Sequence, residues 1–193
     1  MFTERLNESD RAAISAHLLA LSPGDRYLRF GYAARDTSVK RYVRDIDFNQ
    51  DVVFGVRADD HTLDAVMLLA PEKDHAEIAV SVLAPARRRG IGSALISRAA
   101  TYASHHGIDT LYMQSLRETC AIIRIARSLG IQVVTGTTDR TASKPRTSRQ
   151  PLGGDITTKP ITLYDAAMRD AMGGKIPNRI LQRTWQQINQ ARA

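Results

Sequence analysis

The sequence predicts an α/β fold with an antiparallel front half and a β-α-β back half. Three observations lead to this prediction: helical apolar spacing over residues 9–46, strand-like alternation over residues 52–83, and one long helical pattern between two later strand patterns. A chain of 193 residues, of which 43% are hydrophobic, is long enough for one domain with its own core and an appendage.

The first part of the chain predicts one short strand and three amphipathic helices. Apolar residues recur at intervals of three and four in each helical stretch, and Ser22-Pro23-Gly24 ends the first of them. The expected elements are a strand at Phe2–Arg5 and helices at Ser9–Ala20, Asp25–Ala33 and Ser38–Ile46.

Three strands are predicted next. Their bounds are Val52–Val56, Leu63–Leu69 and His75–Leu83, with turns at Asp59–His61 and Pro71–Asp74. The third strand alternates between two faces, of which one carries Ile78, Val80 and Val82 and the other carries Glu77, Ala79 and Ser81. The first face is expected to pack against a core, and the second is expected to form the wall of a cavity.

Turn signals and composition predict the rest of the chain. The expected elements are a helix from Gly90 to about Ser104, a strand at Thr110–Ser115, a helix at about Thr119–Leu129 and a strand at Ile131–Thr137. Residues 135–160 have the composition of a solvated linker, and helices are expected near Leu163–Met172 and Arg179–Ala191. We therefore predict a domain at residues 1–138 and a basic, partly flexible extension at residues 139–193.

The formal charge of +7 is concentrated in the extension. Residues 1–138 hold 17 Lys and Arg against 16 Asp and Glu, whereas residues 139–193 hold 10 against 4. A nearly neutral domain disfavours nucleic acid as its partner, although a nucleic-acid adaptor that uses the extension stays open as a third hypothesis. The one dense cationic cluster of the domain is Arg87-Arg88-Arg89, which indicates a local anion.

Composition also bears on location and metal chemistry. The single Cys120 can form no internal disulfide, and no apolar run approaches the roughly 20 residues of a membrane span. We expect a soluble cytoplasmic protein, with Cys120 as a small buried residue rather than a nucleophile. His105 and His106 are adjacent on a helix and lack a third ligand, so they do not predict a metal site.

A strand that passes into a helix through Arg87–Ala94 predicts an anion-binding site. The first N–H groups of the helix lack intrahelical partners, and the helix dipole adds partial positive charge. Gly90 and Gly92 are expected to keep β-carbons away from a ligand at these N–H groups. A dinucleotide-binding fingerprint would need an acidic residue at the end of the next strand, but Asp109 precedes that strand. A different phosphate-bearing ligand is therefore expected.

The same residues resemble the pyrophosphate loop of the GNAT N-acetyltransferase superfamily, which reads Arg/Gln-x-x-Gly-x-Gly/Ala after an amphipathic strand. Here the loop reads Arg87-Arg88-Arg89-Gly90-Ile91-Gly92. Leu129-Gly130-Ile131 resembles a second family motif, and Leu21–Phe30 resembles a segment of bacterial members related to protein-lysine acetyltransferases. The resemblance covers roughly residues 1–138. It implies a mixed, largely antiparallel central sheet with splayed middle strands flanked by helices.

The resemblance implies that acetyl-CoA is the cosubstrate. The strands that end at Val82 and begin at Thr110 would splay apart to admit its pantetheine arm, and backbone groups of Val82 and Ala84 would contact the pantetheine and the thioester. The residues implied to hold the pyrophosphate are Arg87, Arg88, Arg89, Gly90, Ile91, Gly92, Ser93 and Ala94.

Glu77 is the candidate general base, because it stands on the polar face of its strand and relatives of this subgroup often carry a glutamate there. The alternative is a solvated strand-end carboxylate or one side of an ion pair. Ala126 and Thr119 replace the tyrosine and asparagine that many family members carry on the next helix. The general acid therefore stays open between Ser115 and water.

Together these features predict an acetyl-CoA-dependent N-acetyltransferase that acts directly on a primary amine, either a small molecule or a protein lysine. The replaced tyrosine and asparagine keep a non-catalytic acyl-CoA-binding regulatory module as the alternative. The expected partners are acetyl-CoA and the amine, with no membrane and no metal, and a homodimer stays open. Most of four aromatic residues are expected to pack in the core, although some could line an acceptor pocket: Tyr27, Phe30, Tyr32 and Tyr42.

Overall fold

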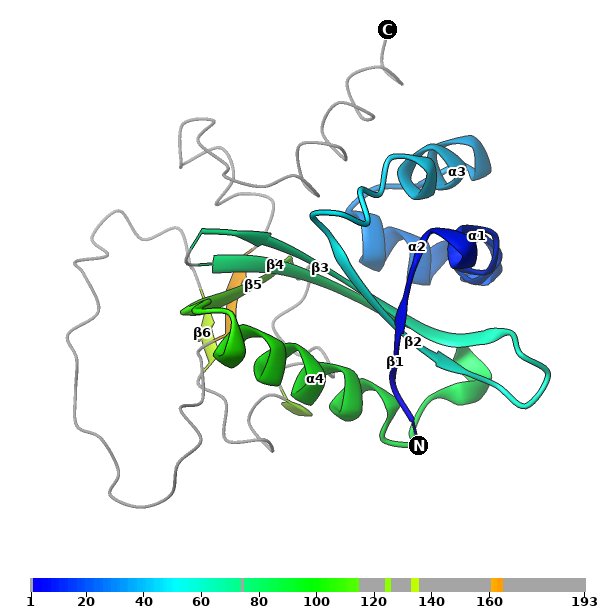
Figure 1. Cartoon of the computed structure of the whole chain (residues 1–193). Helices are drawn as coiled ribbons and strands as arrows, with labels where there is room; N and C mark the ends of the chain where they lie inside the picture. Colours follow the sequence, from blue (N-terminus) through cyan, green and yellow to red (C-terminus); the bar gives the residue numbers. More distant parts are fainter. Residues whose placement is uncertain (1, 74, 115–123, 126–132, 136–160, 165–193) are drawn as a thin grey trace, which may run out of the picture.

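The computed structural model describes residues 2–73, 75–114, 124–125, 133–135 and 161–164. Their strands form one sheet in the order β1-β2-β3-β4-β5-β7-β6 (Figure 1). The strands are β1 (Glu4–Leu6), β2 (Val52–Arg57), β3 (Leu63–Glu72), β4 (His75–Val82), β5 (Thr110–Gln114), β6 (Val133–Thr135) and β7 (Ile161–Tyr164). The helices are α1 (Arg11–Ala20), α2 (Pro23–Phe30), α3 (Asp36–Arg44) and α4 (Ile91–His105), with short 3-10 helices η1 (Glu8–Asp10) and η2 (Ala84–Ala86).

Strand pairing changes direction at β4. The strands β1 to β4 pair antiparallel, whereas β4 with β5, β5 with β7 and β7 with β6 pair parallel. The parallel connection from β4 to β5 places α4 on one face of the sheet, and α1, α2 and α3 cover the other face (Figure 1). The predicted class, an α/β fold with an antiparallel front half and a β-α-β back half, is confirmed.

Local caps decide where α2 begins and ends. The Asp25 N–H donates to Ser22 Oγ at 3.1 Å, and Pro23 occupies the first helical position, where its missing N–H costs nothing. Gly31 ends the helix with a φ of 78°, a conformation that favours glycine. The helix therefore starts before the predicted Asp25 and stops before the predicted end.

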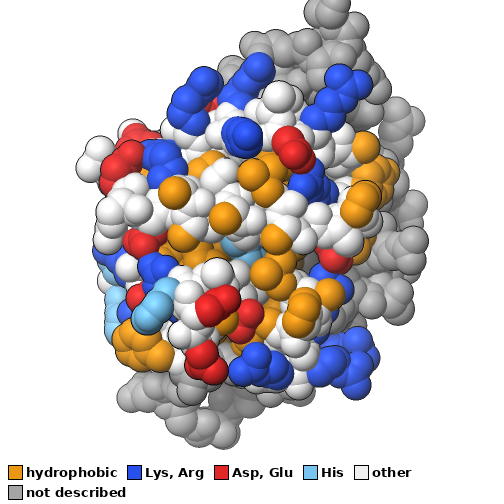
Figure 2. Space-filling model, turned by 90° about the vertical axis from the view of Figure 1, so that its right-hand side faces the viewer, with side chains coloured by type: hydrophobic (Ala, Val, Ile, Leu, Met, Phe, Trp, Pro, Cys, Tyr) orange, Lys and Arg blue, Asp and Glu red, His pale blue; other side chains and the backbone are white. Residues whose placement is uncertain are grey.

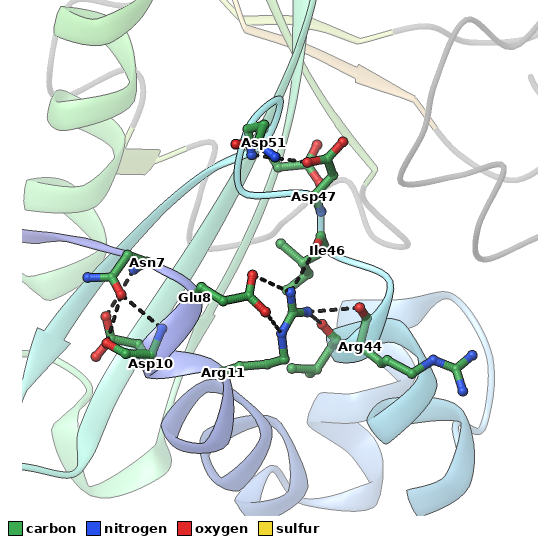
Figure 3. Close-up of polar contacts among 11 residues, drawn as sticks. Asn7, Glu8, Asp10, Arg11, Arg44, Ile46, Asp47 and Asp51 are labelled. Atoms are coloured by element: carbon green, nitrogen blue, oxygen red, sulfur yellow. Dashed lines mark hydrogen bonds and ion pairs between the residues drawn. The ribbon is translucent and has the colours of Figure 1, made fainter.

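Arg11 fastens α1 to the end of α3 (Figure 3). Its guanidinium donates to the carbonyls of Val43, Arg44 at 2.9 Å and Ile46 at 3.1 Å, and it pairs with Glu8 at 2.7 Å. The last carbonyls of a helix have no intrahelical partner, and a cation there also meets the negative end of the helix dipole. This polar contact adds to the apolar cluster that already joins the two helices through Leu18 of α1 and Val43 of α3.

An apolar core lies on each face of the sheet. On one face Leu95 of α4 packs in a cluster with Met67 of β3, and on the other face Leu18 of α1 packs in a cluster with Leu68 of β3. Each such buried side chain contributes about 1.5–3 kcal/mol to folding. Four polar side chains of the described residues are buried as well: His17, Asp51, Glu77 and Ser81.

Several strand boundaries predicted from the sequence are wrong by one to three residues, and those of β3 and β1 have a physical reason. The strand β3 continues through Pro71, which pairs with Ala76 of β4, beyond the last β2 pairing at Leu69. A proline is tolerated there because the described β2 offers no further ladder partner on that side. The strand β1 ends at Leu6 rather than at Arg5, and Leu6 is the residue of β1 that reaches the core.

The region after β5 also differs from expectation. Leu163 and Tyr164, predicted as the start of a helix, belong to β7, which lies between β5 and β6. Arg124 and Ile125 are helical as predicted, and the remainder of the predicted helices at about 119–129, 163–172 and 179–191 lies outside the described residues. The division of the chain at residue 138 stays a prediction, although β7 comes from the later part.

Charged side chains are mixed on the face of the molecule shown in Figure 2. Lys and Arg side chains lie there in several groups, with Asp, Glu and hydrophobic side chains between them. Within the described residues no helix has both the length and the apolar character needed to cross a membrane.

Candidate active site

The sheet opens between β4 and β5. Parallel pairing with β5 covers only His75 to Glu77, and Glu77 pairs with Tyr112. Beyond this point the described part of β5 offers β4 no partner, and residues 78–82 pair with β3 alone. The predicted splay is therefore present, and Glu77 and Tyr112 stand at its vertex.

Backbone groups of β4 face this opening at alternate residues. The Leu83 N–H donates to the Asp64 carbonyl of β3 at 2.9 Å. Successive residues of a strand direct their N–H and C=O groups to opposite edges. Val82 and Val80 therefore turn these groups toward the opening, where an extended ligand with amide groups can pair as an added strand would.

The turn from β4 to α4 leaves the start of α4 accessible. Arg88 and Gly90 have positive φ angles of 65° and 80°. A β-carbon at Gly90 would meet nothing within 4 Å, so this glycine serves the backbone conformation and leaves space beside it. The helix α4 begins at Ile91, and its N-cap residue, Gly90, has no side chain with which to bond the first N–H groups. These donors and the helix dipole favour an anion at this point.

Gly92 lies against the helical residues at 124–125. A β-carbon there would lie 3.0 Å from Ile125 Cδ1. The missing side chain thus makes room for these residues, and the expected role of Gly92 beside a ligand stays a prediction. Close approach of two chain segments is the physical reason for glycine at this position.

Arg87 is held by groups on both sides of the loop. Its Nη2 lies 2.6 Å from Asp25 Oδ1 of α2. Its Nε donates to the Val82 carbonyl at 3.1 Å, on the edge of β4 that faces the opening. Charge-assisted hydrogen bonds of this kind are among the stronger polar contacts, so the guanidinium has a defined orientation.

The other two arginines of the loop differ from each other. Arg89 Nη1 is 3.6 Å from Asp64 Oδ2 of β3. Arg88 is exposed and makes neither an ion pair nor a hydrogen bond with the described residues. Because Asp25 and Asp64 neutralise Arg87 and Arg89, the uncompensated positive charge of the loop is centred on Arg88.

Glu77 is buried, with 3% of its surface exposed. Its face of β4 also carries Ala79, which packs against the core below α1–α3, and the buried Ser81. The helices α1–α3 cover this face, so the alternative of a solvated strand-end carboxylate is wrong. The expected cavity wall stays a prediction.

Tyr42 of α3 and Arg29 of α2 lie near Glu77. Arg29 Nη2 donates to Tyr42 Oη at 2.8 Å, and the guanidinium lies 5.2 Å from the centre of the ring. Burial raises the pKa of Tyr42; Arg29 opposes the rise, and the charges of Glu77 and Asp51 add to it. A neutral phenol and a buried carboxylate thus stand close enough to influence each other.

His17 joins three elements beneath the opening. Its Nδ1 lies 2.8 Å from the Leu63 carbonyl and its Nε2 lies 2.8 Å from Ser81 Oγ. Because a carbonyl only accepts, Nδ1 carries the hydrogen, and Nε2 accepts from the Ser81 hydroxyl. Burial lowers the pKa of His17, which the Leu63 carbonyl partly opposes, so the ring is held in its neutral form.

Several residues considered from the sequence lie outside the described residues: Ser115, Thr119, Cys120 and Ala126. Within the described residues no group of three His, Cys, Asp or Glu side chains is placed to hold a metal ion. Sequence reasoning missed the partners of the loop arginines, Asp25 and Asp64, and the pairing of His17 with Ser81. No local pattern signals these contacts, because each joins distant parts of the chain.

The fold and the site together define a class of protein: a split α/β sheet with an arginine-rich strand-to-helix loop at one end of the opening and a buried carboxylate at the other. The chain belongs to the Acetyltransferase (GNAT) family, whose model matches residues 24–134. Membership supports acetyl transfer with acetyl-CoA as the donor. No curated protein sequence matches the chain.

Solved structures share the fold. The GNAT domain of S. lividans PAT is 21% identical, with a TM-score of 0.56 over 73% of this chain and 84% of that chain. A spermidine N-acetyltransferase from Vibrio cholerae, in complex with CoA and spermine, is 17% identical, with a TM-score of 0.52 over 67% and 79%. The ribosomal-protein-S18-alanine N-acetyltransferase from Escherichia coli is 16% identical, with a TM-score of 0.51 over 71% and 84%.

Proposed function

We propose that this protein is an acetyl-CoA-dependent N-acetyltransferase that transfers an acetyl group directly to a primary amine, either of a small molecule or of a protein lysine. One observation carries the proposal: the edge of β4 that no described strand pairs beyond Glu77 leads from the loop at residues 87–94 to the buried Glu77. Family membership supports acetyl transfer, and the names of two structural neighbours, which act on spermidine and on a ribosomal protein, support an amine as acceptor.

The residues present fit acetyl-CoA. The uncapped N–H groups at the start of α4, together with Arg88, suit the pyrophosphate. The backbone groups of Val82 and Val80 on the opening edge suit the amides of the pantetheine arm. We assign pyrophosphate binding to residues 87–94 and pantetheine contacts to Val82 and Ala84.

The opening is long enough for an extended ligand to reach from the loop to Glu77. Residues 78–82 span roughly 16 Å at about 3.3 Å per residue. A linear arm anchored at the loop and extended along this edge would therefore bring its far end toward the vertex. Glu77 stands there, so the carboxylate and the reacting end of the cosubstrate would meet in a buried place.

When bound, acetyl-CoA would supply a thioester carbonyl that a neutral amine can attack; the C–S bond would break as the C–N bond forms, and CoA would leave as a thiolate that water protonates. Glu77 takes the proton from the amine nitrogen, directly or through a water. The N–H groups of β4 that face the opening donate to the carbonyl oxygen as negative charge develops on it. Burial of Glu77 limits the access of bulk water, which strengthens these electrostatic contacts.

Calorimetric titration of the whole protein with acetyl-CoA tests the donor, and CoA release across a panel of primary amines and lysine peptides tests the reaction. We expect binding in the micromolar range and release with at least one amine. Absence of binding would remove the proposal. Binding without release for any amine would instead support a non-catalytic acyl-CoA-binding module. The cytoplasmic location and the homodimer stay predictions.

A further inference from the structure

Asp25 lies outside the loop at residues 87–94 but forms an ion pair with one of its arginines, Arg87. It belongs to the first turn of α2, which packs on the opposite face of the sheet from α4. Its Oδ1 is 2.6 Å from Arg87 Nη2. Through this contact the helical layer and the loop are joined by one ion pair.

The carboxylate of Asp25 is itself fixed in place. Ser22 Oγ donates to Asp25 Oδ2 at 2.6 Å and accepts from the Asp25 N–H at 3.1 Å. Partial burial raises the pKa of Asp25, but the hydrogen bond from Ser22 and the charge and hydrogen bond of Arg87 lower it more. Each carboxylate oxygen thus has its own donor, and the group stays ionised.

The contacts of Arg87 leave part of its guanidinium available. The Nε hydrogen goes to the Val82 carbonyl and one Nη2 hydrogen goes to Asp25. The Nη1 group and the other Nη2 hydrogen are not used by these two contacts, and the side chain is 44% exposed. The guanidinium is therefore held by its Nε and one Nη2 hydrogen, and its remaining Nη hydrogens, here called the outer donors, can bind a ligand.

We propose that Asp25 is a positioning residue for cosubstrate binding, which holds Arg87 across the mouth of the opening so that its outer donors face the anionic groups of CoA. The inference rests on the proposed function. An arginine fixed before the ligand arrives loses less side-chain freedom on binding than a mobile one. The contact with the Val82 carbonyl also sets the guanidinium beside the edge along which the pantetheine would run.

The negative charge of Asp25 could also repel a phosphate, but the groups around the carboxylate reduce this repulsion. A carboxylate near a phosphate site weakens binding when its charge is exposed to the ligand. Here the two oxygens are engaged by Arg87 and Ser22 at 2.6 Å each. The charge that a ligand meets is that of the pair rather than that of an isolated carboxylate.

Calorimetric titration of the full-length chain with CoA tests the inference through three variants. Asp25→Ala should weaken CoA binding about tenfold, the size expected for one oriented charged contact. Asp25→Asn should lose less CoA affinity than Asp25→Ala, because its amide oxygen can still accept a hydrogen bond from Arg87. In an Arg87→Ala background, Asp25→Ala should add no further loss, since its effect passes through that arginine.

Asp36→Ala is the matched control. It removes another first-turn carboxylate, which pairs with Arg26 Nη1 at 2.5 Å, but leaves the ion pair between Asp25 and Arg87, so its CoA affinity should stay within about twofold of the parent. Circular dichroism checks that each variant is folded, and Asp25→Asn carries the test should Asp25→Ala fail to fold.

The outcomes separate the inference from the proposed function. No CoA binding by the parent protein overturns the proposed function itself. Binding by the parent with equal or tighter binding by Asp25→Ala overturns only the inference. An equal loss from Asp25→Ala with and without Arg87 also overturns it, because Asp25 would then act through the fold rather than through the arginine.

Discussion

The two faces of the central sheet are packed with different chemistry. Each face buries an apolar cluster, one beneath α1–α3 and one beneath α4, but the buried polar side chains of the described residues are absent from the α4 face. The four buried polar side chains border the other face: His17 belongs to α1, Ser81 bonds to it, Glu77 shares the face of Ser81, and Asp51 acts on Tyr42 of α3. The α4 face therefore supports the loop by shape, and the α1–α3 face holds the groups that can carry protons.

The difference follows from the cost of burying polar groups. An apolar core needs only complementary shape, whereas each buried polar side chain loses water and needs a partner in the protein. His17 shows this cost being met, because both of its ring nitrogens have partners at 2.8 Å. Buried polar groups that a protein retains despite the cost of desolvation are candidates for a catalytic role. The comparison of the two faces can therefore be tested by changing residues of one face at a time.

The largest expected effect comes from Glu77 on the α1–α3 face. Glu77→Gln keeps the shape of the side chain and removes the base, so turnover with a reactive amine should fall at least about 100-fold. The affinity for CoA should stay unchanged, since the loop lies at the other end of the opening. Steady-state kinetics and calorimetry measure the two quantities.

Glu72→Gln is the control for this prediction, because Glu72 is a more exposed carboxylate at the end of β3. Its turnover should match that of the parent protein. A Glu77→Gln enzyme with parental turnover would show that Glu77 is not the base and that the α1–α3 face does not carry the proton.

The next largest effect is expected at Arg88, in the loop that precedes α4. Arg88→Ala should weaken CoA binding about tenfold, because Arg88 carries the uncompensated charge and one charged hydrogen bond is worth about that factor. Arg98→Ala removes the same charge from an exposed position on α4, over the Phe54 ring, and should change the affinity less than about twofold. Equal losses in the two variants would mean that only net charge matters.

His17 should make stability depend on pH. Its pKa is lowered in the folded state, so between that value and the unfolded value of about 6.5 the unfolded chain binds the proton and the folded chain does not. Stability is then fully present above about pH 6.5 and falls as the pH drops below it, by up to about 1.4 kcal/mol per pH unit. Urea unfolding between pH 5 and 8 measures this slope.

The comparison with His17→Gln isolates the contribution of His17 to that slope. The variant should be less stable at pH 8, because it loses the fitted contacts to Leu63 and Ser81, and it should show a flatter pH dependence. The same slope in both proteins would place the titrating group elsewhere.

The smallest expected effect is at Gly90. Gly90→Ala should lower the free energy of unfolding by about 1 kcal/mol, the cost of a β-carbon at positive φ, since the added methyl meets nothing within 4 Å. Gly92→Ala is the matched comparison, because its β-carbon would press on Ile125 at 3.0 Å. Thermal unfolding of both variants measures the difference, and an unchanged Gly90→Ala would show that the loop relaxes without cost.

Local patterns were enough to predict the parts of the site that are continuous in the chain. The loop at residues 87–94 follows from a strand that passes directly into a helix, and the alternation of β4 placed Glu77 and Ser81 on one face. Burial of that face was not predictable, because it depends on helices whose packing direction no local pattern states. The pattern predicts Leu163 and Tyr164 as the start of a helix, but they belong to β7, whose short apolar run obtains its partners from β5 and β6.

The amino-acid sequence by itself determined the class of fold and the strand-to-helix loop at residues 87–94, because periodicity and turn residues act over a few neighbouring residues. Only the tertiary structure decided that Asp25 holds Arg87, that His17 is neutral between Leu63 and Ser81, and that Glu77 is buried. These facts depend on which distant segments come into contact. Contacts of that kind are set by the packing of whole elements against the sheet, which no single stretch of sequence contains.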